Sequence, residues 1–304
     1  MKKKIFDNDQ MEQIRIGLEE GLDVSKYIQL SLQGHPIFDS YQMYAIRMGL
    51  EAGLDISQYT QLNHKGRPIY DGYEMSVIRM GLEAGLDISQ YNQLDPHGHP
   101  IFDWAQMYAI HEGLNDGLDI SQYTQLNHKG RPIYYALQMS EIRQGIKQGL
   151  DISKYTQLDP HGHPIYNARQ MSQIREGLEQ GLDISQYTQL NHKGHPIFNW
   201  EQMSEIRRGL YHGLDISQYT QLNHKGRPIY DADQMFEIRM DLLVGFFKLR
   251  DEKSLINLDP NKSSKSSLSD FDKTPTDLKD SKVINEYNKS SHTPSESQSK
   301  SRKL

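Results

Sequence analysis

The chain has 304 residues, of which 36% are hydrophobic and 24% charged, and its formal net charge is -6 at pH 7. It contains no cysteine, which excludes disulfides, thiol catalysis and cysteine-ligated zinc. The acidic balance argues against the broad basic footprint of a typical nucleic-acid-binding protein.

One 32-residue unit recurs eight times between residue 6 and about residue 245. Its most regular members are the methionines Met11, Met43, Met75, Met107, Met139, Met171, Met203 and Met235. A unit of this size cannot bury its apolar side alone, whereas a stack of such units can. The predicted fold class is therefore all-α, a solenoid of eight 32-residue units of helix, short helix and turn over residues 1–250.

The second unit shows how each helix is predicted to begin and end. Asp39 as N-cap, with Gln42 three residues later, has the spacing of a capping box. Met43 starts an apolar stripe at helical spacing, and Gly53 stands where a left-handed cap would end the helix. Gly49 recurs inside the helix in most units, and we interpret it as a place where the backbone of a neighbouring unit passes too close for a methyl group.

A second, shorter helix is predicted after this glycine. Asp55 and Gln58 repeat the capping-box spacing, so we place the helix over about residues 56–62, with Tyr59 on its inner side. The following residues, 63–66, have the sequence Asn-His-Lys-Gly, which is typical of a type I turn.

The last unit departs from the pattern. Asp241 replaces the helical glycine, and the sequence continues as LLVGFFKLR, which we interpret as a C-terminal capping helix. Phe246 and Phe247 either cover the last apolar stripe or form a docking patch, and covering is favoured because exposed apolar patches are less common. Residues 251–304 are rich in Ser, Lys, Asp and Asn and are predicted to be a disordered tail.

The unit resembles two kinds of known repeat. The pattern Gln-Met-x-x-Ile-Arg-x-Gly-Leu-x-x-Gly-Leu-Asp, over residue 6 to about residue 245, is similar to an uncharacterised helical repeat in proteins of Gram-positive bacteria and their mobile elements. This resemblance implies a repeat fold and no particular activity. The run Gly-Leu-Asp-Ile-Ser before a Gly-containing turn also looks superficially like ankyrin, but its spacing differs by about one helical turn.

One basic residue recurs inside each long helix. This ladder consists of Arg15, Arg47, Arg79, His111, Arg143, Arg175, Arg207 and Arg239. It would either bind phosphates and acidic side chains of a partner or pair with an acidic ladder of neighbouring units. The acidic ladder consists of Asp23, Asp55, Asp87, Asp119, Asp151, Asp183 and Asp215. The structural interpretation is favoured, because ladders of opposite sign in a stack are expected to pair.

The turns carry a second polar series. Following the turn glycine stand His35, Arg67, His99, Arg131, His163, His195 and Arg227, and within the turns stand His64, His97, His128, His161, His192 and His224. Together they predict an exposed rim that is open to binding. The pairs of histidines in two turns invite a metal site, but one loop supplies too few ligands for zinc, so no metal and no cofactor is predicted.

Aromatic residues at outward positions are the best candidates for partner contacts. They are Trp104, Trp200, Tyr44, Tyr108, Tyr211 and Phe236. Exposed aromatic side chains are enriched at binding hot spots. The alternative, that they fill gaps against the preceding turn, is equally compatible with the sequence.

No catalytic motif occurs, and nearly every polar residue recurs in several units, unlike a single active site. We therefore predict a protein–protein interaction scaffold and no enzyme. The alternatives are a reader of single-stranded nucleic acid that uses the basic ladder, which the acidic array disfavours, and a structural spacer. The start of the chain lacks an apolar signal segment and no run of about 18 apolar residues occurs, so we expect no membrane association and a cytoplasmic location.

Overall fold

The computed structural model describes residues 4–256, with side chains through Lys248, and within this range it confirms the all-helical repeat fold. Eight α-helices alternate there with seven short 3₁₀ helices. The α-helices are α1 (Asn8–Glu19), α2 (Ser40–Glu51), α3 (Gly72–Glu83), α4 (Trp104–Asn115), α5 (Ala136–Lys147), α6 (Ala168–Glu179), α7 (Trp200–Tyr211) and α8 (Ala232–Ile256). The 3₁₀ helices η1 to η7 are Val24–Lys26, Ile56–Gln58, Ile88–Gln90, Ile120–Gln122, Ile152–Lys154, Ile184–Gln186 and Ile216–Gln218.

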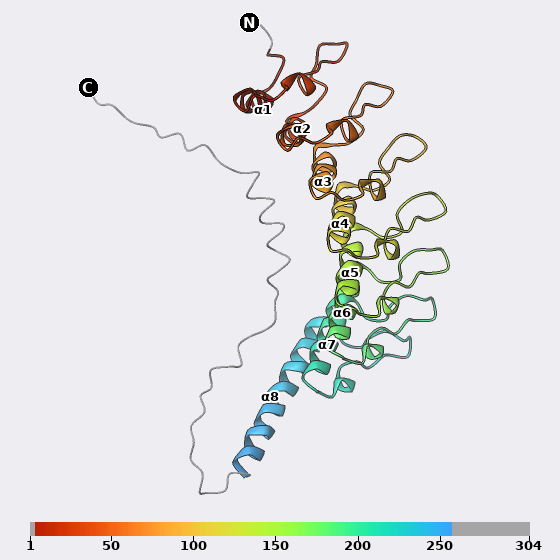
Figure 1. The fold of residues 1–304 in the computed structure, drawn as a ribbon. Helices are drawn as coiled ribbons and strands as arrows, with labels where there is room; N and C mark the ends of the chain where they lie inside the picture. Colours follow the sequence, from red (N-terminus) through yellow and green to blue (C-terminus); the bar gives the residue numbers. More distant parts are fainter. Residues whose placement is uncertain (1–3, 257–304) are drawn as a thin grey trace, which may run out of the picture. The chain divides into compact units, whose positions relative to one another are not determined.

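Residues Met1–Leu249 form one compact unit, in which successive helices pack side by side. From α1 to α7 each α-helix contacts the next one in the chain (Figure 1). The 3₁₀ helices and the loops that follow them all lie on one side of this row (Figure 1). The array therefore presents a helix side and a loop side, each repeated once per unit.

Local capping fixes both ends of most of the long helices, and α2 shows how. The carboxylate of Asp39 accepts from the backbone N–H of Gln42 at 2.8 Å, and the side chain of Gln42 accepts from the N–H of Asp39 at 2.9 Å, so the predicted capping box is present. At the other end Gly53 has φ +69°, and the N–H of Leu54 donates to the carbonyl of Gly49 at 2.9 Å. This is a Schellman cap, which satisfies carbonyls that the helix itself leaves free.

The second helix is shorter than predicted. It comprises only Ile56–Gln58, because the carboxylate of Asp55 accepts from the N–H and the hydroxyl of Ser57 and not from the backbone of Gln58. Tyr59 then leaves helical geometry with φ -137°. A side chain that binds two residues ahead makes a tight turn and does not start a longer helix.

The loop that follows is a short hairpin. Leu62 and Pro68 form an isolated antiparallel bridge, and the N–H of Gly66 donates to the carbonyl of Asn63 at 2.9 Å. Gly66 has φ +70°, which is the glycine position of a three-residue hairpin loop with a bulge. The backbone groups of residues 62–68 are thus paired with one another, which also explains why no helix continues to Leu62.

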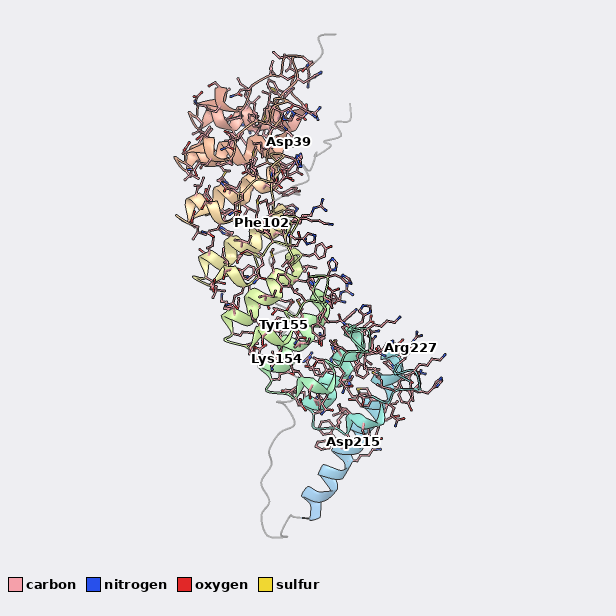
Figure 2. The ribbon with its side chains drawn as sticks, turned by 90° about the vertical axis from the view of Figure 1, so that its right-hand side faces the viewer. Asp39, Phe102, Lys154, Tyr155, Asp215 and Arg227 are labelled. Carbon is pink, nitrogen blue, oxygen red and sulfur yellow. The ribbon has the colours of Figure 1, made fainter. Side chains whose placement is uncertain are left out.

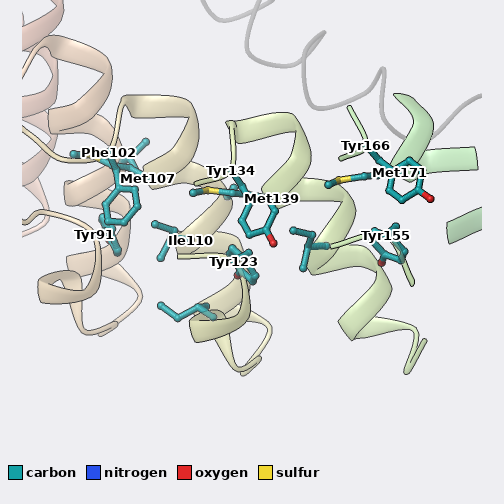
Figure 3. Packing of buried hydrophobic residues seen from close by; sticks show 14 of the residues in the cluster. Tyr91, Phe102, Met107, Ile110, Tyr123, Tyr134, Met139, Tyr155, Tyr166 and Met171 are labelled. Atoms are coloured by element: carbon teal, nitrogen blue, oxygen red, sulfur yellow. The ribbon is translucent and has the colours of Figure 1, made fainter. Parts of the chain in front are cut away.

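The core is a continuous row of tyrosine, methionine and isoleucine side chains between the units (Figure 3). Among its fully buried members are Tyr27, Tyr59, Tyr91, Tyr123, Tyr155, Tyr187 and Tyr219, each of which ends a 3₁₀ helix. Met107, Met139 and Met171 lie along the same row and are also fully buried. The predicted burial of the apolar stripe by stacking is therefore confirmed for the methionines from Met43 to Met235, whereas Met11 in the first unit is 49% exposed.

The prediction that the helical glycine makes room for the backbone of a neighbouring unit is wrong. A Cβ at Gly49 would overlap the hydroxyl oxygen of Tyr59, which is a side chain of the same unit and not the backbone of a neighbour. The tyrosine folds back beneath its own helix, and its hydroxyl donates to the carbonyl of Ala45 at 3.4 Å. The same overlap holds at Gly17, Gly81, Gly113, Gly145, Gly177 and Gly209. Each glycine therefore makes room for the largest core residue of its unit.

The C-terminal helix extends further than predicted. With Asp241 in place of the glycine, α8 continues to Ile256. The predicted tail, residues 251–304, lies outside the described residues except for the part that α8 reaches. Phe246 and Phe247 are 43% and 44% exposed, so the favoured prediction that they cover the last apolar stripe is wrong.

Candidate interaction surface

The basic ladder lies at the interfaces between units. Five of its members, Arg47, His111, Arg175, Arg207 and Arg239, are between 5% and 8% exposed, whereas the side chain of Arg15 is 54% exposed. Arg47 pairs with Glu20 of the preceding unit at 2.9 Å, and Arg175 pairs with Glu141 at 2.8 Å. These contacts correspond to the structural interpretation of the ladder, because a phosphate would have to displace a carboxylate that is already paired with a buried guanidinium.

The acidic ladder is not the partner that the sequence suggested. Asp55 binds the N–H and the hydroxyl of Ser57, and this bond lowers the pKa of Asp55. Asp215 caps η7 in the same manner (Figure 2). These carboxylates hold the 3₁₀ helices, while glutamates and glutamines on the α-helices take the arginines. Two ladders of opposite sign therefore serve two separate local functions.

One position on the preceding helix decides whether a ladder residue finds a second acceptor. Gln13 accepts from Nε of Arg47 at 3.2 Å, and Gln173 accepts from Nε of Arg207 at 3.0 Å. At the three interfaces from α2 to α5 this position holds Ala45, Val77 and Ala109. The facing atoms, Arg79 Nε, His111 Nδ1 and Arg143 Nε, are buried without a hydrogen-bond acceptor in the described part of the chain. These three interfaces are therefore less completely hydrogen-bonded than those on either side.

His111 interrupts the charge of the ladder. Burial lowers the pKa of this histidine, and the nearby carboxylate of Glu112 only partly opposes the change. The imidazole is consequently uncharged at neutral pH. A continuous line of positive charge through the array, as the nucleic-acid hypothesis requires, is thus broken at α4.

Three of the predicted contact residues lie against the ladder. The rings of Tyr44 and Phe236 face the guanidinium of the arginine three positions later, at 5.6 Å and 5.4 Å. Tyr108 stacks on the histidine at the equivalent place, with 6.2 Å between ring centroids. Tyr44 and Phe236 are exposed, whereas Tyr108 is partly buried. This helix position therefore covers the ladder, which is a structural role.

The other three differ in how accessible they are. Trp200 is partly buried, and the guanidinium of Arg169 lies 4.7 Å from the centroid of its ring. Tyr211 is 56% exposed near the end of α7, and Trp104 is 41% exposed at the start of α4. The two tryptophans, which are equivalent in sequence, are thus not equivalent on the surface.

Trp104 belongs to a row of exposed aromatic rings that the sequence did not reveal. We call Tyr41, Tyr73 and Trp104 the aromatic strip. Tyr41 and Tyr73 are stacked, with 5.6 Å between ring centroids, and Tyr73 lies 5.5 Å from Trp104. Their exposed fractions are 54%, 36% and 41%. The strip crosses the first turns of α2, α3 and α4. Leu137, which is 73% exposed, is the second residue of α5, as Tyr41 and Tyr73 are of α2 and α3.

Gly72 allows the first two rings of the strip to come together. A Cβ at this first residue of α3 would overlap the Cβ of Tyr41 and lie 2.9 Å from its carbonyl carbon. Other units carry asparagine, serine, alanine or tryptophan at this position. Two tyrosines at the second residue of consecutive helices, next to this glycine, form the signal from which the strip could have been predicted.

A partly buried glutamate stands beside the strip. Glu74 is the third residue of α3, where the other seven units have glutamine. Burial raises the pKa of Glu74 to about 7, and the N-cap carboxylates Asp71 and Asp103 add to this rise, while the backbone N–H of Asp71 opposes it. Glu74 therefore titrates near neutral pH and not in the acidic range usual for a glutamate.

The polar rim predicted in the turns is present on the loop side. All the basic and histidine residues predicted there are exposed, including Arg227 at the last hairpin (Figure 2). His97 and His99, which invited a metal site, have ring centroids 6.5 Å apart. Among the described residues no group of three or more histidine, aspartate or glutamate side chains is arranged to hold a metal ion.

Comparisons with known proteins give no further assignment: no family model, curated protein or solved structure matches this chain. Within residues 4–256 no helix combines the length and the apolar character that crossing a bilayer demands. The surface itself is therefore the only guide to what the array binds.

Proposed function

We propose that the array is a scaffold that binds a protein partner through the aromatic strip. The observation that supports this most is that Tyr41, Tyr73 and Trp104 stack on one another and stay exposed. Tyrosine and tryptophan offer large contact areas at a low cost in conformational entropy and dominate binding hot spots. A row across three packed helices offers a partner an extended contact without a pocket.

The fold does not require these rings. At the second helical residue other units carry Ala105, Arg169 or Glu201, and at the first they carry Ala136 or Ala168. Those units form helices of the same length, and in each the glutamine at the third helical residue accepts from the backbone N–H of the N-cap. A side chain that is costly to expose and unnecessary for folding supports a role in binding.

The test compares three chains in affinity capture from the native host. The first is the wild type, the second carries Tyr41→Ala, Tyr73→Ala and Trp104→Ala, and the third is a control with Leu32→Ala and Ile229→Ala, which removes exposed apolar groups elsewhere. We expect a protein that the wild type and the control retain to be lost from the strip variant. With that protein purified, affinity should fall by at least about 30-fold, because one hot-spot residue contributes about 2 kcal/mol or more. Equal retention by all three chains would contradict the assignment.

The two alternative functions give different results. A gel shift with single-stranded RNA and DNA at low salt tests the nucleic-acid alternative, for which salt-sensitive retention should vanish in a variant with Arg47→Ala, Arg79→Ala and Arg143→Ala. Burial of these side chains against the neighbouring helix gives that alternative no support. A spacer would leave partner capture and host phenotype unchanged in the strip variant. The absence of catalysis and a cytoplasmic location stay predictions.

A further inference from the structure

At every internal interface except those of α2 with α3 and of α3 with α4, two units are joined by polar contacts that run in both directions. The side-chain amide of Gln42 donates to the carbonyl of Tyr70, at the start of the next unit, at 2.8 Å. The same bond recurs from Gln10, Gln106, Gln138, Gln170 and Gln202. In the opposite direction Arg239 donates to Glu205 of the preceding helix at 2.6 Å. The forward face of a helix thus carries a glutamine and an acceptor, and the backward face carries an arginine and a carbonyl.

Helix α8 exposes such a forward face. In the last unit Gln234 and Glu237 are the equivalents of Gln202 and Glu205. Gln234 and Glu237 are both exposed. The side-chain oxygen of Gln234 accepts from the backbone N–H of its N-cap Asp231, and within the described residues its amide nitrogen donates to no carbonyl. Phe236 and Met240 on the same helix are 46% and 37% exposed.

Helix α1 exposes the matching backward face. This face carries Phe6, Met11 and Arg15. They are the equivalents, 32 residues earlier, of Phe38, Met43 and Arg47 in the second unit. Met11 is 49% exposed, whereas the seven equivalent methionines are 0% exposed. The side chain of Arg15 is 54% exposed, against 8% for Arg47. The two ends of the array therefore present the two halves of the interface that holds its interior together.

We propose that copies of this chain associate head to tail, with α8 of one copy packed against α1 of the next. The amide of Gln234 then donates to the carbonyl of Phe6 in the second copy, and Arg15 of that copy pairs with Glu237. Burial of Met11 against the exposed apolar side of α8 supplies most of the affinity, and the ion pair sets the register. A contact between two different surfaces leaves one free end of each kind, so longer assemblies form unless a ring closes.

Association requires Arg15 to exchange one partner. In α1 the Nε of Arg15 donates to Glu12 of the same helix at 2.9 Å. Inside the array the Nε of the equivalent Arg47 donates instead to Gln13 of the preceding helix. Four other units carry serine at the position of Glu12, for example Ser76. Glu12→Ser should therefore free the guanidinium and strengthen association by about fivefold, which corresponds to one surface ion pair.

Light scattering coupled to size-exclusion chromatography over a concentration series of the full chain tests the proposal. We expect the average mass of the wild type to rise with concentration, and Arg15→Glu or Glu237→Arg alone to weaken association by about tenfold or more. An equimolar mixture of the two variants should recover it, because every contact between unlike copies is then complementary in charge. Far-UV circular dichroism checks that both variants fold, as expected for exposed positions.

Two results would overturn the proposal. One is a wild-type chain that stays monomeric up to millimolar concentration. The other is a mixture of Arg15→Glu and Glu237→Arg that associates no better than either variant alone, which would show that Arg15 of one copy does not meet Glu237 of another. Neither result depends on the aromatic strip, so this experiment and the partner-capture experiment succeed or fail separately.

Discussion

Replacing Glu74 by glutamine is expected to stabilise the protein, and to do so most above neutral pH. In the equivalent place Gln42 donates its amide to the carbonyl of Tyr70 at 2.8 Å. A carboxylate has no proton to donate, and by the repeat register Glu74 meets the carbonyl of Phe102. Burial at this site raises the pKa of Glu74 to about 7, so the protein favours the protonated form, which can donate as glutamine does.

The sign of the pH dependence follows from proton binding. The carboxyl group titrates at 4.5 in the unfolded chain and at about 7 in the folded protein, so the folded state binds more protons between these values. The stability that protonated Glu74 contributes is complete below about pH 4.5 and is lost as the pH rises through 7. At about 1.4 kcal/mol per pKa unit the full difference would be about 3.4 kcal/mol, and partial exposure of the side chain to solvent reduces it to about 1 to 2 kcal/mol.

Urea unfolding followed by circular dichroism at about pH 5 and about pH 8.5 measures this difference. We expect Glu74→Gln to exceed the wild type by about 1 to 2 kcal/mol at the higher pH and to match it closely at the lower pH. Glu201→Gln, at an exposed glutamate near the start of α7, is the control and should show no such pH dependence. If Glu74→Gln changes the free energy of unfolding equally at both pH values, the glutamate is not held as an uncharged acid and the reasoning is refuted.

Three further substitutions test the packing between and within units. Gly49→Ala is expected to lower the free energy of unfolding, measured by thermal unfolding, by about 1 to 3 kcal/mol, because the added methyl overlaps the hydroxyl of Tyr59. Adding Tyr59→Phe should recover part of the loss, and no recovery would contradict this explanation of the glycine. Ala109→Gln is expected to stabilise by about 1 kcal/mol, because it offers Arg143 the acceptor it lacks, and equal stabilisation by Ala109→Leu would show that size alone is responsible. Arg47→Ala is expected to cost about 1 to 3 kcal/mol and to increase hydrogen exchange in α1 and α2, and unchanged exchange would argue against a structural ladder.

Features that depend on a few neighbouring residues were predictable from the sequence. The capping box of Asp39 and Gln42 and the left-handed Gly53 are settled within one turn of the helix they bound. The second helix was predicted too long for an equally local reason. Ser57 competes with Gln58 for the carboxylate of Asp55, and the hydroxyl of Ser57 gives it a second hydrogen bond.

Features that depend on the distance between units were not predictable. The sequence indicated that Arg47 would pair with a neighbouring acid, but whether Asp23 or Glu20 lies within reach is decided by how two helices pack. The cause of the glycine at position 49 required knowing that Tyr59 folds back under its own helix. The aromatic strip escaped notice for the same reason, because rings 32 residues apart form one surface only when the units stack in register.

The two kinds of departure from the repeat fall on the same helices, and this argues for a specific function of that region. Ala45, Val77 and Ala109 remove an acceptor at the interfaces from α2 to α5, and the strip from Tyr41 to Trp104 lies on α2, α3 and α4. These interfaces therefore lack a hydrogen bond that their equivalents toward α7 have. A spacer selected only for length gives no reason for the missing acceptors to coincide with exposed rings. The scaffold proposal gives one, because a partner bound across α2 to α4 would add contacts where the interfaces between helices lack this hydrogen bond.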